Sequence, residues 1–233
     1  QKVKEGAEVT MYHAEDWNPK QKLLGSIILD EKKLDDAVGL TLELHSYVHT
    51  SDTSNIQTKT LEDELWDGLD RKAFITMPTI KDVTIAWNLW HITRIEDLTV
   101  NILIADSKQV FDDWQSRLKV EVKDTGNAMS DEEILALSAG LDMLELRSYR
   151  KAVGIRTREV LSALKPGDMR VKVKQDRLNR IFSEGGVLEA EESKWLLDFW
   201  GKKNIAGLIM MPVTRHQIVH LNDSFKLKKK CKK

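Results

Sequence analysis

The residues of this chain best suited to chemistry are its six histidines, because four of them form two pairs spaced four residues apart. His45 and His49 form one pair and His216 and His220 the other, while His91 lies midway along an apolar stretch. Residues four apart lie one turn above each other on the same face of a helix, so each pair can direct two imidazoles at one point. A third imidazole from a neighbouring helix completes a three-histidine site with an open coordination position, which suits a catalytic divalent metal ion.

Several familiar metal and cofactor sites are excluded by the residues around these histidines. A zinc protease has Glu directly after the first histidine of its pair, whereas Gln217 occupies that position here. Di-iron bundles need a Glu three residues before a histidine on two helices, and none of the histidines has Glu at that spacing. Phosphate-loop, dinucleotide and hydrolase-elbow motifs do not occur in the sequence. The pattern therefore favours a mononuclear site rather than a carboxylate-rich one.

Each histidine also has an ordinary structural interpretation. A single buried histidine such as His91 is commonly hydrogen-bonded to a carbonyl or carboxylate group of the core. His216 and His220 are harder to explain in that way, because two buried imidazoles on one stripe would each need a partner and a shared metal ion satisfies both. His45 and His49 could add a fourth ligand, transfer protons or bind substrate. Alternatively they are structural, or exposed near a helix C-terminus, where a cation is favoured.

Other side chains near the histidines are candidates for supporting roles. Trp87 is large enough to line a pocket, although core packing is the commoner role of such a residue. Asp223 follows the second pair by three residues and could orient an imidazole, as carboxylates do for metal-bound histidines. Glu96 and Asp97 are expected instead to pair with Arg94 or with a neighbouring helix.

The elements that position these residues are predicted to be helices almost throughout. The chain has only 4 Pro, and long stretches carry apolar residues at three- and four-residue spacing. We predict long helices over 31–49, 81–105 and 130–164, a short one over 61–69, and a last helix that begins at Pro212. Four long amphipathic helices predict an all-α fold, a four-helix bundle.

One segment departs from this pattern. Residues 168–201 contain shorter helical pieces over 176–182 and 191–200, and we interpret the segment as a helical insertion before the last helix. It is too short to form a core of its own. We therefore expect a single domain over residues 1–233.

Composition limits the classes of partner. The 36 basic residues are balanced by 37 acidic ones, so bulk charge does not indicate a nucleic-acid partner. The exception is the lysine-rich tail over 226–233, for which we expect a solvated end, and nucleic-acid binding through it ranks last. The single cysteine, Cys231, excludes a disulfide or cysteine-based zinc site within one chain. No apolar run reaches the roughly 20 residues that span a bilayer. The first six residues do not resemble a signal peptide, so we expect a cytoplasmic protein without membrane contact.

Two segments of the chain resemble motifs of the DinB/YfiT-like superfamily. Residues 87–97, W-N-L-W-H-I-T-R-I-E-D, are similar to that family's second-helix stretch W-x-x-x-H-[IL]-x-x-x-E, and residues 215–222 are similar to its fourth-helix H-x-x-x-H. The resemblance implies that His91, His216 and His220 are metal ligands in an up-down-down-up four-helix bundle. It covers the bundle, over about 31–105 and 130–228, but not the insertion.

The resemblance also implies a reaction class. Characterised relatives include thiol-dependent transferases and isomerases that use bacillithiol or mycothiol, and the family holds a divalent ion, often zinc, nickel or iron. We therefore expect a metal-dependent enzyme with a small-molecule substrate, in which the ion activates a thiol or water for S-transfer or isomerisation. We also expect a homodimer, since bundles of this kind often dimerise. The alternative is a non-catalytic interaction protein whose histidines are structural or vestigial and whose tail or insertion binds a partner.

Overall fold

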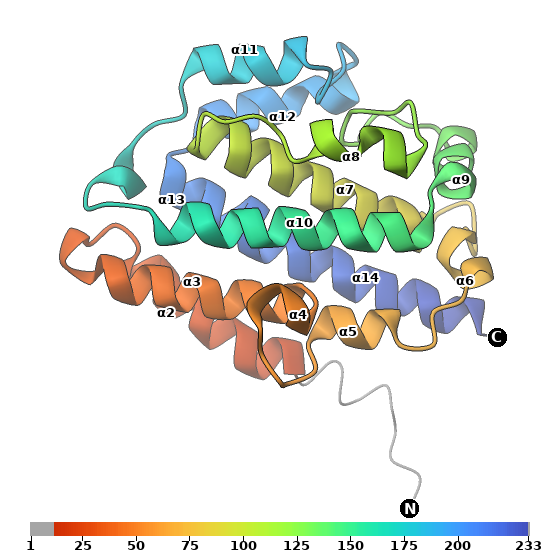
Figure 1. The fold of residues 1–233 in the computed structure, drawn as a ribbon, viewed down its shortest axis with the longest axis horizontal. Coiled ribbons are helices and arrows are strands. Elements are labelled where there is room, and N and C mark those ends of the chain that lie inside the picture. The colour runs from red at the N-terminus through yellow and green to blue at the C-terminus, as the bar shows by residue number, and fades with distance from the viewer. Residues whose placement is uncertain (1–11, 233) are drawn as a thin grey trace, which may run out of the picture.

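The computed structural model describes residues 12–232, and helices of different lengths make up its regular structure (Figure 1). Within these residues the only β-type pairing is an isolated bridge between Lys172 and Asn204. The prediction of an all-α protein is therefore confirmed. The first six residues, which gave the expectation about a signal peptide, lie outside the described part of the chain. None of the described helices is both long and apolar enough to cross a membrane.

Helix α7 (Ile85–Asp97) lies at the centre of the fold and continues directly into a π-helical segment, η3 (Leu98–Ile104). It begins at Thr84, whose hydroxyl accepts the Trp87 N–H at 2.9 Å. Every residue from 85 to 104 except Trp87 is buried. A helix buried on all sides must be surrounded by other elements, so its polar side chains have to find partners inside the protein.

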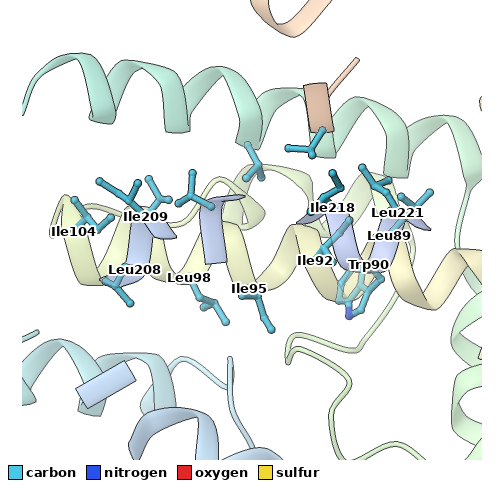
Figure 2. Packing of buried hydrophobic residues seen from close by; sticks show 14 of the residues in the cluster. Leu89, Trp90, Ile92, Ile95, Leu98, Ile104, Leu208, Ile209, Ile218 and Leu221 are labelled. Atoms are coloured by element: carbon cyan, nitrogen blue, oxygen red, sulfur yellow. The ribbon is translucent and has the colours of Figure 1, made fainter. Parts of the chain in front are cut away.

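Three further helices surround α7. They are α3 (Leu34–Val48), α10 (Met143–Ser162) and α14 (His216–Cys231). Helix α7 contacts α10 and α14 extensively, and α3 contacts both of those helices. All four run roughly along the long axis of the molecule in Figure 1. Figure 2 shows the apolar side chains that fill the region around α7, among them Ile92 of α7 and Ile218 of α14.

The predicted first helix is confirmed, with a helix before it that was not predicted. Its first turn is the 3₁₀ segment η2 (Glu31–Lys33), capped by Asp30, which accepts the Lys32 N–H at 3.1 Å. The additional helix is α2 (Asn18–Ile27), which follows the π-helical η1 (Tyr12–Trp17) and packs against α3. This helix was not predicted because its sequence is largely polar and only every third of its residues is buried.

The predicted third helix is two helices. Helix α9 (Asp131–Gly140) begins at Ser130 with a capping box to Glu133, as its acidic first turn indicated. The chain then turns, and Asp142 caps α10 by accepting the N–H groups of Leu144 and Glu145 at 2.9 and 3.0 Å. The prediction of one helix over 130–164 was wrong because the apolar spacing continues across this stop and start.

The last helix begins earlier than predicted. It runs through α13 (Ile205–Leu208), the π-helical η5 (Ile209–Arg215) and α14, and Asn204 caps it by accepting the Gly207 N–H at 2.9 Å. Pro212 lies inside η5 instead of starting the helix. In a π-helix the hydrogen bonds reach back five residues, so the proline ring does not meet the carbonyl that it would meet in an α-helix.

The lysine-rich tail is solvated only in part over residues 226–232, because Lys226, Lys229, Lys230 and Lys232 are exposed as expected but Lys228 is not. Helix α14 continues through it to Cys231. Lys228 is buried, and its ammonium group caps the end of α5 (Leu61–Trp66). It donates to the carbonyls of Glu64, Leu65 and Asp67 at 3.2, 2.7 and 2.6 Å.

The insertion holds the two predicted helices, α11 (Gln175–Ser183) and α12 (Glu191–Gly201). They lie together on one side of the molecule, with α11 packed against η3 (Figure 1). The remaining short helices are α4 (Ser51–Ser54), α6 (Arg71–Ile75), α8 (Phe111–Leu118) and η4 (Asp168–Arg170).

Candidate metal centre

The three histidines predicted as ligands come together between α7 and α14. Potential ligand atoms of His91, His216 and His220 all lie within 4.8 Å of one another. The ring centroid of His91 lies 5.0 Å from that of His216 and 4.9 Å from that of His220, and the latter two are 4.6 Å apart. His91 is buried, whereas His216 and His220 are partly exposed. The group therefore reaches from the core towards the surface, and it could hold a metal ion.

Four side chains on one face of α7 meet four consecutive carbonyls of the loop over 123–126. The pairs are Arg94 Nε with Lys123 O at 2.9 Å, Trp90 Nε1 with Asp124 O at 3.0 Å, His91 Nδ1 with Thr125 O at 2.8 Å and Trp87 Nε1 with Gly126 O at 3.2 Å. A carbonyl oxygen can only accept, so His91 donates from Nδ1. Its Nε2 atom then keeps a lone pair for a ligand.

The ring of His220 is oriented in the same way by a different partner. Its Nδ1 atom lies 3.0 Å from Asn88 Oδ1, and Asn88 Nδ2 donates to Ser224 Oγ at 3.2 Å. Ser224 Oγ donates its own proton to the His220 carbonyl at 2.8 Å, so it accepts from the Asn88 amide and fixes the amide orientation. His220 Nδ1 therefore donates to Asn88 Oδ1, and Nε2 is free to bind a ligand. Asp223 does not take this place, because its carboxylate pairs with Lys226 at 2.8 Å. The orienting group is therefore an amide from the neighbouring helix.

Trp87 and His216 complete the surroundings of this group. The Trp87 indole stacks on His91 with centroids 4.6 Å apart and planes 8° apart, so this half-buried ring forms one wall. His216 Nδ1 is buried and has no hydrogen-bond partner. An unpaired buried nitrogen costs free energy, and a ligand at this atom would supply the missing partner.

Burial keeps the three imidazoles neutral. It lowers the pKa of His91 to about 3, with a further decrease from His220 and an opposing effect of the Thr125 carbonyl. Burial also lowers the pKa of His216 well below its usual value, and that of His220 below its usual value. Neutral imidazole is the form that binds metal ions, so the residues present fit such an ion.

His45 and His49 form a separate group with Glu96. Each Glu96 oxygen lies near one ring, at 2.9 Å from His45 Nε2 and 3.0 Å from His49 Nε2, and the two rings stack at 4.2 Å. All three side chains are fully buried, so an exposed position for the histidines is ruled out. Gly154 allows α10 to approach this group, because a Cβ there would lie 2.6 Å from His49 Nδ1.

Glu96 and Asp97 have the kinds of partner that the sequence predicted. Asp97 pairs with Arg94 at 3.2 Å, and Glu96 pairs with two histidines at the C-terminal end of the neighbouring helix α3. The sequence did not indicate that Glu96 could be a metal ligand. Burial acts to raise the pKa of Glu96, but His49 and His45 outweigh it and hold that pKa well below the usual range. The group therefore combines a carboxylate with two imidazoles, and it too could hold a metal ion.

Comparison of the chain with protein-family models found no match, and comparison with curated proteins also found none. The similarity to the DinB/YfiT-like superfamily thus rests on the motifs over 87–97 and 215–222. The structure adds two groups of potential metal ligands as evidence about function.

Proposed function

We propose that the protein is a metal-dependent enzyme in which His91, His216 and His220 hold one divalent transition-metal ion. The observation that carries this proposal is the pair of hydrogen bonds from His91 to Thr125 and from His220 to Asn88. Partners of this kind select the tautomer and ring direction of metal-bound histidines. An all-imidazole ligand set suits zinc, nickel or iron.

We further propose that the chain is a member of the DinB/YfiT-like superfamily, with α3, α7, α10 and α14 as an up-down-down-up four-helix bundle. The packing of α7 against α10 and α14, and of α3 against the latter two, supports this proposal. In this assignment α2, α8 and the insertion over 168–201 are additions to the bundle.

The chemistry follows from the side chains around the site. When bound, a divalent ion lowers the pKa of a coordinated water towards about 7 and favours thiolate over thiol. His216 and His220 are partly exposed residues, so the side of the site on which they lie is where we place the small molecule. Trp87 offers an aromatic surface against which a substrate can lie. We assign the reaction to S-transfer or isomerisation with a low-molecular-weight thiol such as bacillithiol or mycothiol.

This assignment is tested by loading the protein with Zn²⁺, Ni²⁺ or Fe²⁺ and assaying thiols with electrophilic acceptors. Thiol-dependent turnover is expected in the wild type and is lost in His216→Ala. Val219→Ala serves as a control from the same helical turn, because its side chain is 42% exposed and should leave turnover unchanged. Bound metal without turnover would contradict the reaction class, and failure to bind metal would favour the non-catalytic alternative.

A further inference from the structure

A second group of potential ligands lies in the core and has no part in the proposed catalytic centre. His45 and His49 come from α3 and Glu96 comes from α7. All three are 0% exposed, and their potential ligand atoms lie within 4.8 Å of one another. Three side chains with strong electron-pair donors are thus buried together, and such groups need partners.

The donor atoms of this group converge. The Nε2 atoms of His45 and His49 lie 2.9 and 3.0 Å from the two oxygens of the same carboxylate. Thr157 of α10 donates its hydroxyl proton to Glu96 Oε1 at 2.7 Å, which holds the carboxylate in place. A hydrogen bond of this kind is typical of a carboxylate that binds metal.

The two nitrogens of the His49 ring face two different carboxylates. His49 Nδ1 has no hydrogen-bond partner, and the atom that faces it at 3.9 Å is Oε2 of Glu62. Without a metal ion the ring proton lies on Nε2, where it donates to Glu96 Oε2 at 3.0 Å, and the Nδ1 lone pair faces the Glu62 carboxylate. A metal ion bound at Nε2 would shift this proton to Nδ1, and the repulsion between the Nδ1 lone pair and the Glu62 carboxylate would be replaced by an attraction.

The nearby guanidinium does not supply a cation to Glu96. Arg150 pairs with Glu62 at 2.9 Å and donates to the Val48 carbonyl at 2.6 Å. Among the described residues, the ion pairs of Glu96 are with His45 and His49 alone. A second proton on His49 would make that ring an imidazolium 4.2 Å from the stacked His45 ring, and it would pair only one imidazole with the carboxylate. One divalent ion would bind both imidazoles and the carboxylate.

We propose that His45, His49 and Glu96 form a second site for a divalent transition-metal ion, and that this site is structural. Two histidines and a carboxylate are a ligand set that binds zinc. Full burial leaves no path for a substrate, so the ion's role is to join α3 to α7. Binding then contributes directly to folding, and the ion leaves only when the core opens.

Zinc stoichiometry of the full chain tests this site. After incubation with Zn²⁺ and removal of the excess, the wild type is expected to hold two equivalents and Glu96→Gln one. Asp97→Asn is the matched control, because it removes a neighbouring buried carboxylate of the same helix and should leave two equivalents. One equivalent in the wild type, unchanged in Glu96→Gln, would overturn the second site. The zinc stoichiometry of the wild type can be measured even if a variant fails to fold.

A variant without the proposed catalytic ligands separates the two sites. His91→Ala/His216→Ala/His220→Ala is expected to retain one Zn²⁺ that resists EDTA in the folded protein and is released in guanidinium chloride. Complete loss of zinc from this variant, in protein that remains helical by circular dichroism, would overturn the second site. If only the catalytic proposal is wrong, the wild type holds one equivalent and loses it in Glu96→Gln.

Discussion

Asn88 decides which nitrogen of His220 is available to a ligand, because its Oδ1 atom accepts from Nδ1 at 3.0 Å. Replacing Asn88 with Leu removes this acceptor, and we expect the zinc affinity of the group His91, His216 and His220 to fall by about ten- to a hundredfold. Asn88→Asp retains an acceptor at the same position and should recover most of that loss. Competition titrations with a chromophoric chelator measure the affinities. Equal affinities in Asn88→Leu and the wild type would show that the contact does not orient the ring.

The buried imidazole of His91 also makes the metal-free protein sensitive to acid. Its pKa is about 3 in the folded protein and 6.5 ordinarily. Between these values the unfolded chain binds a proton that the folded chain does not, so stability falls as the pH decreases through this window. His91 alone should lower the free energy of unfolding by about 2 kcal/mol between pH 7 and pH 5.

Guanidinium titrations in the presence of EDTA measure this loss. His91→Gln, which cannot titrate, should lose about 2 kcal/mol less than the wild type over the same interval. The same decrease in both proteins would mean that other groups cause the acid sensitivity.

The residues of the proposed catalytic site were predictable, and those of the proposed second site were predictable only in part. An H-x-x-x-H pair and a third histidine on a core-facing stripe predict imidazoles that converge, and the structure brings His91, His216 and His220 together. The contact of Asn88 with His220 and the place of Glu96 among potential metal ligands were not predicted, and the reason is common to both. Helix α7 is buried on nearly every side, so no single stripe distinguishes the residues that face a neighbour. Their partners are decided by packing between distant segments.

At the scale of elements, α7 and the loop over 123–126 form one unit. Trp87, Trp90, His91 and Arg94 occupy one helical face, and each carries an N–H donor that reaches a carbonyl of the loop. The spacing of these four residues is visible in the sequence. The sequence does not show that they bind the loop, because the loop lies more than 25 residues further along the chain. Thr125 is tied in turn to the insertion by its N–H, which donates to Gly186 O at 3.2 Å.

Gly126 tests whether this loop supports the site. Its φ is +77°, and a Cβ there would lie 2.7 Å from Trp87 Nε1. We therefore expect Gly126→Ala to destabilise the protein by about 1–3 kcal/mol and to weaken zinc binding at His91. Gly39→Ala is the matched control, because it lies in α3 with nothing within 4 Å, and it should be neutral or stabilising by up to about 1 kcal/mol. Thermal denaturation and zinc titration would compare them, and equal behaviour of the two variants would refute the role of the loop.

The limits of the helices show what periodicity can and cannot predict. The first helix was predicted to within a few residues because Asp30 caps its start. The insertion helices were predicted as closely because Gly185 and Gly186 separate them. The break at Leu141 and the early start of the last helix were missed. In both places the apolar spacing continues across the boundary, and only the caps Asp142 and Asn204 mark it.

At the scale of the whole molecule, metal binding should be visible as stability. A ligand that binds only the folded state at a hundred times its Kd adds about 2.7 kcal/mol, which corresponds to about 5–10 °C in Tm for a chain of this size. We expect EDTA to lower the Tm by this amount or more, and added Zn²⁺ to restore it. Differential scanning calorimetry measures the change, and an unchanged Tm would contradict a metal-bound core.

Elemental analysis shows whether His91, His216 and His220 hold one metal ion. The protein is purified without a tag, chelator or nickel column, loaded with Zn²⁺ and compared with His216→Ala prepared in the same way. The wild type is expected to hold one equivalent more than the variant, whether or not the second site is also filled. Equal zinc content in the two proteins would contradict it.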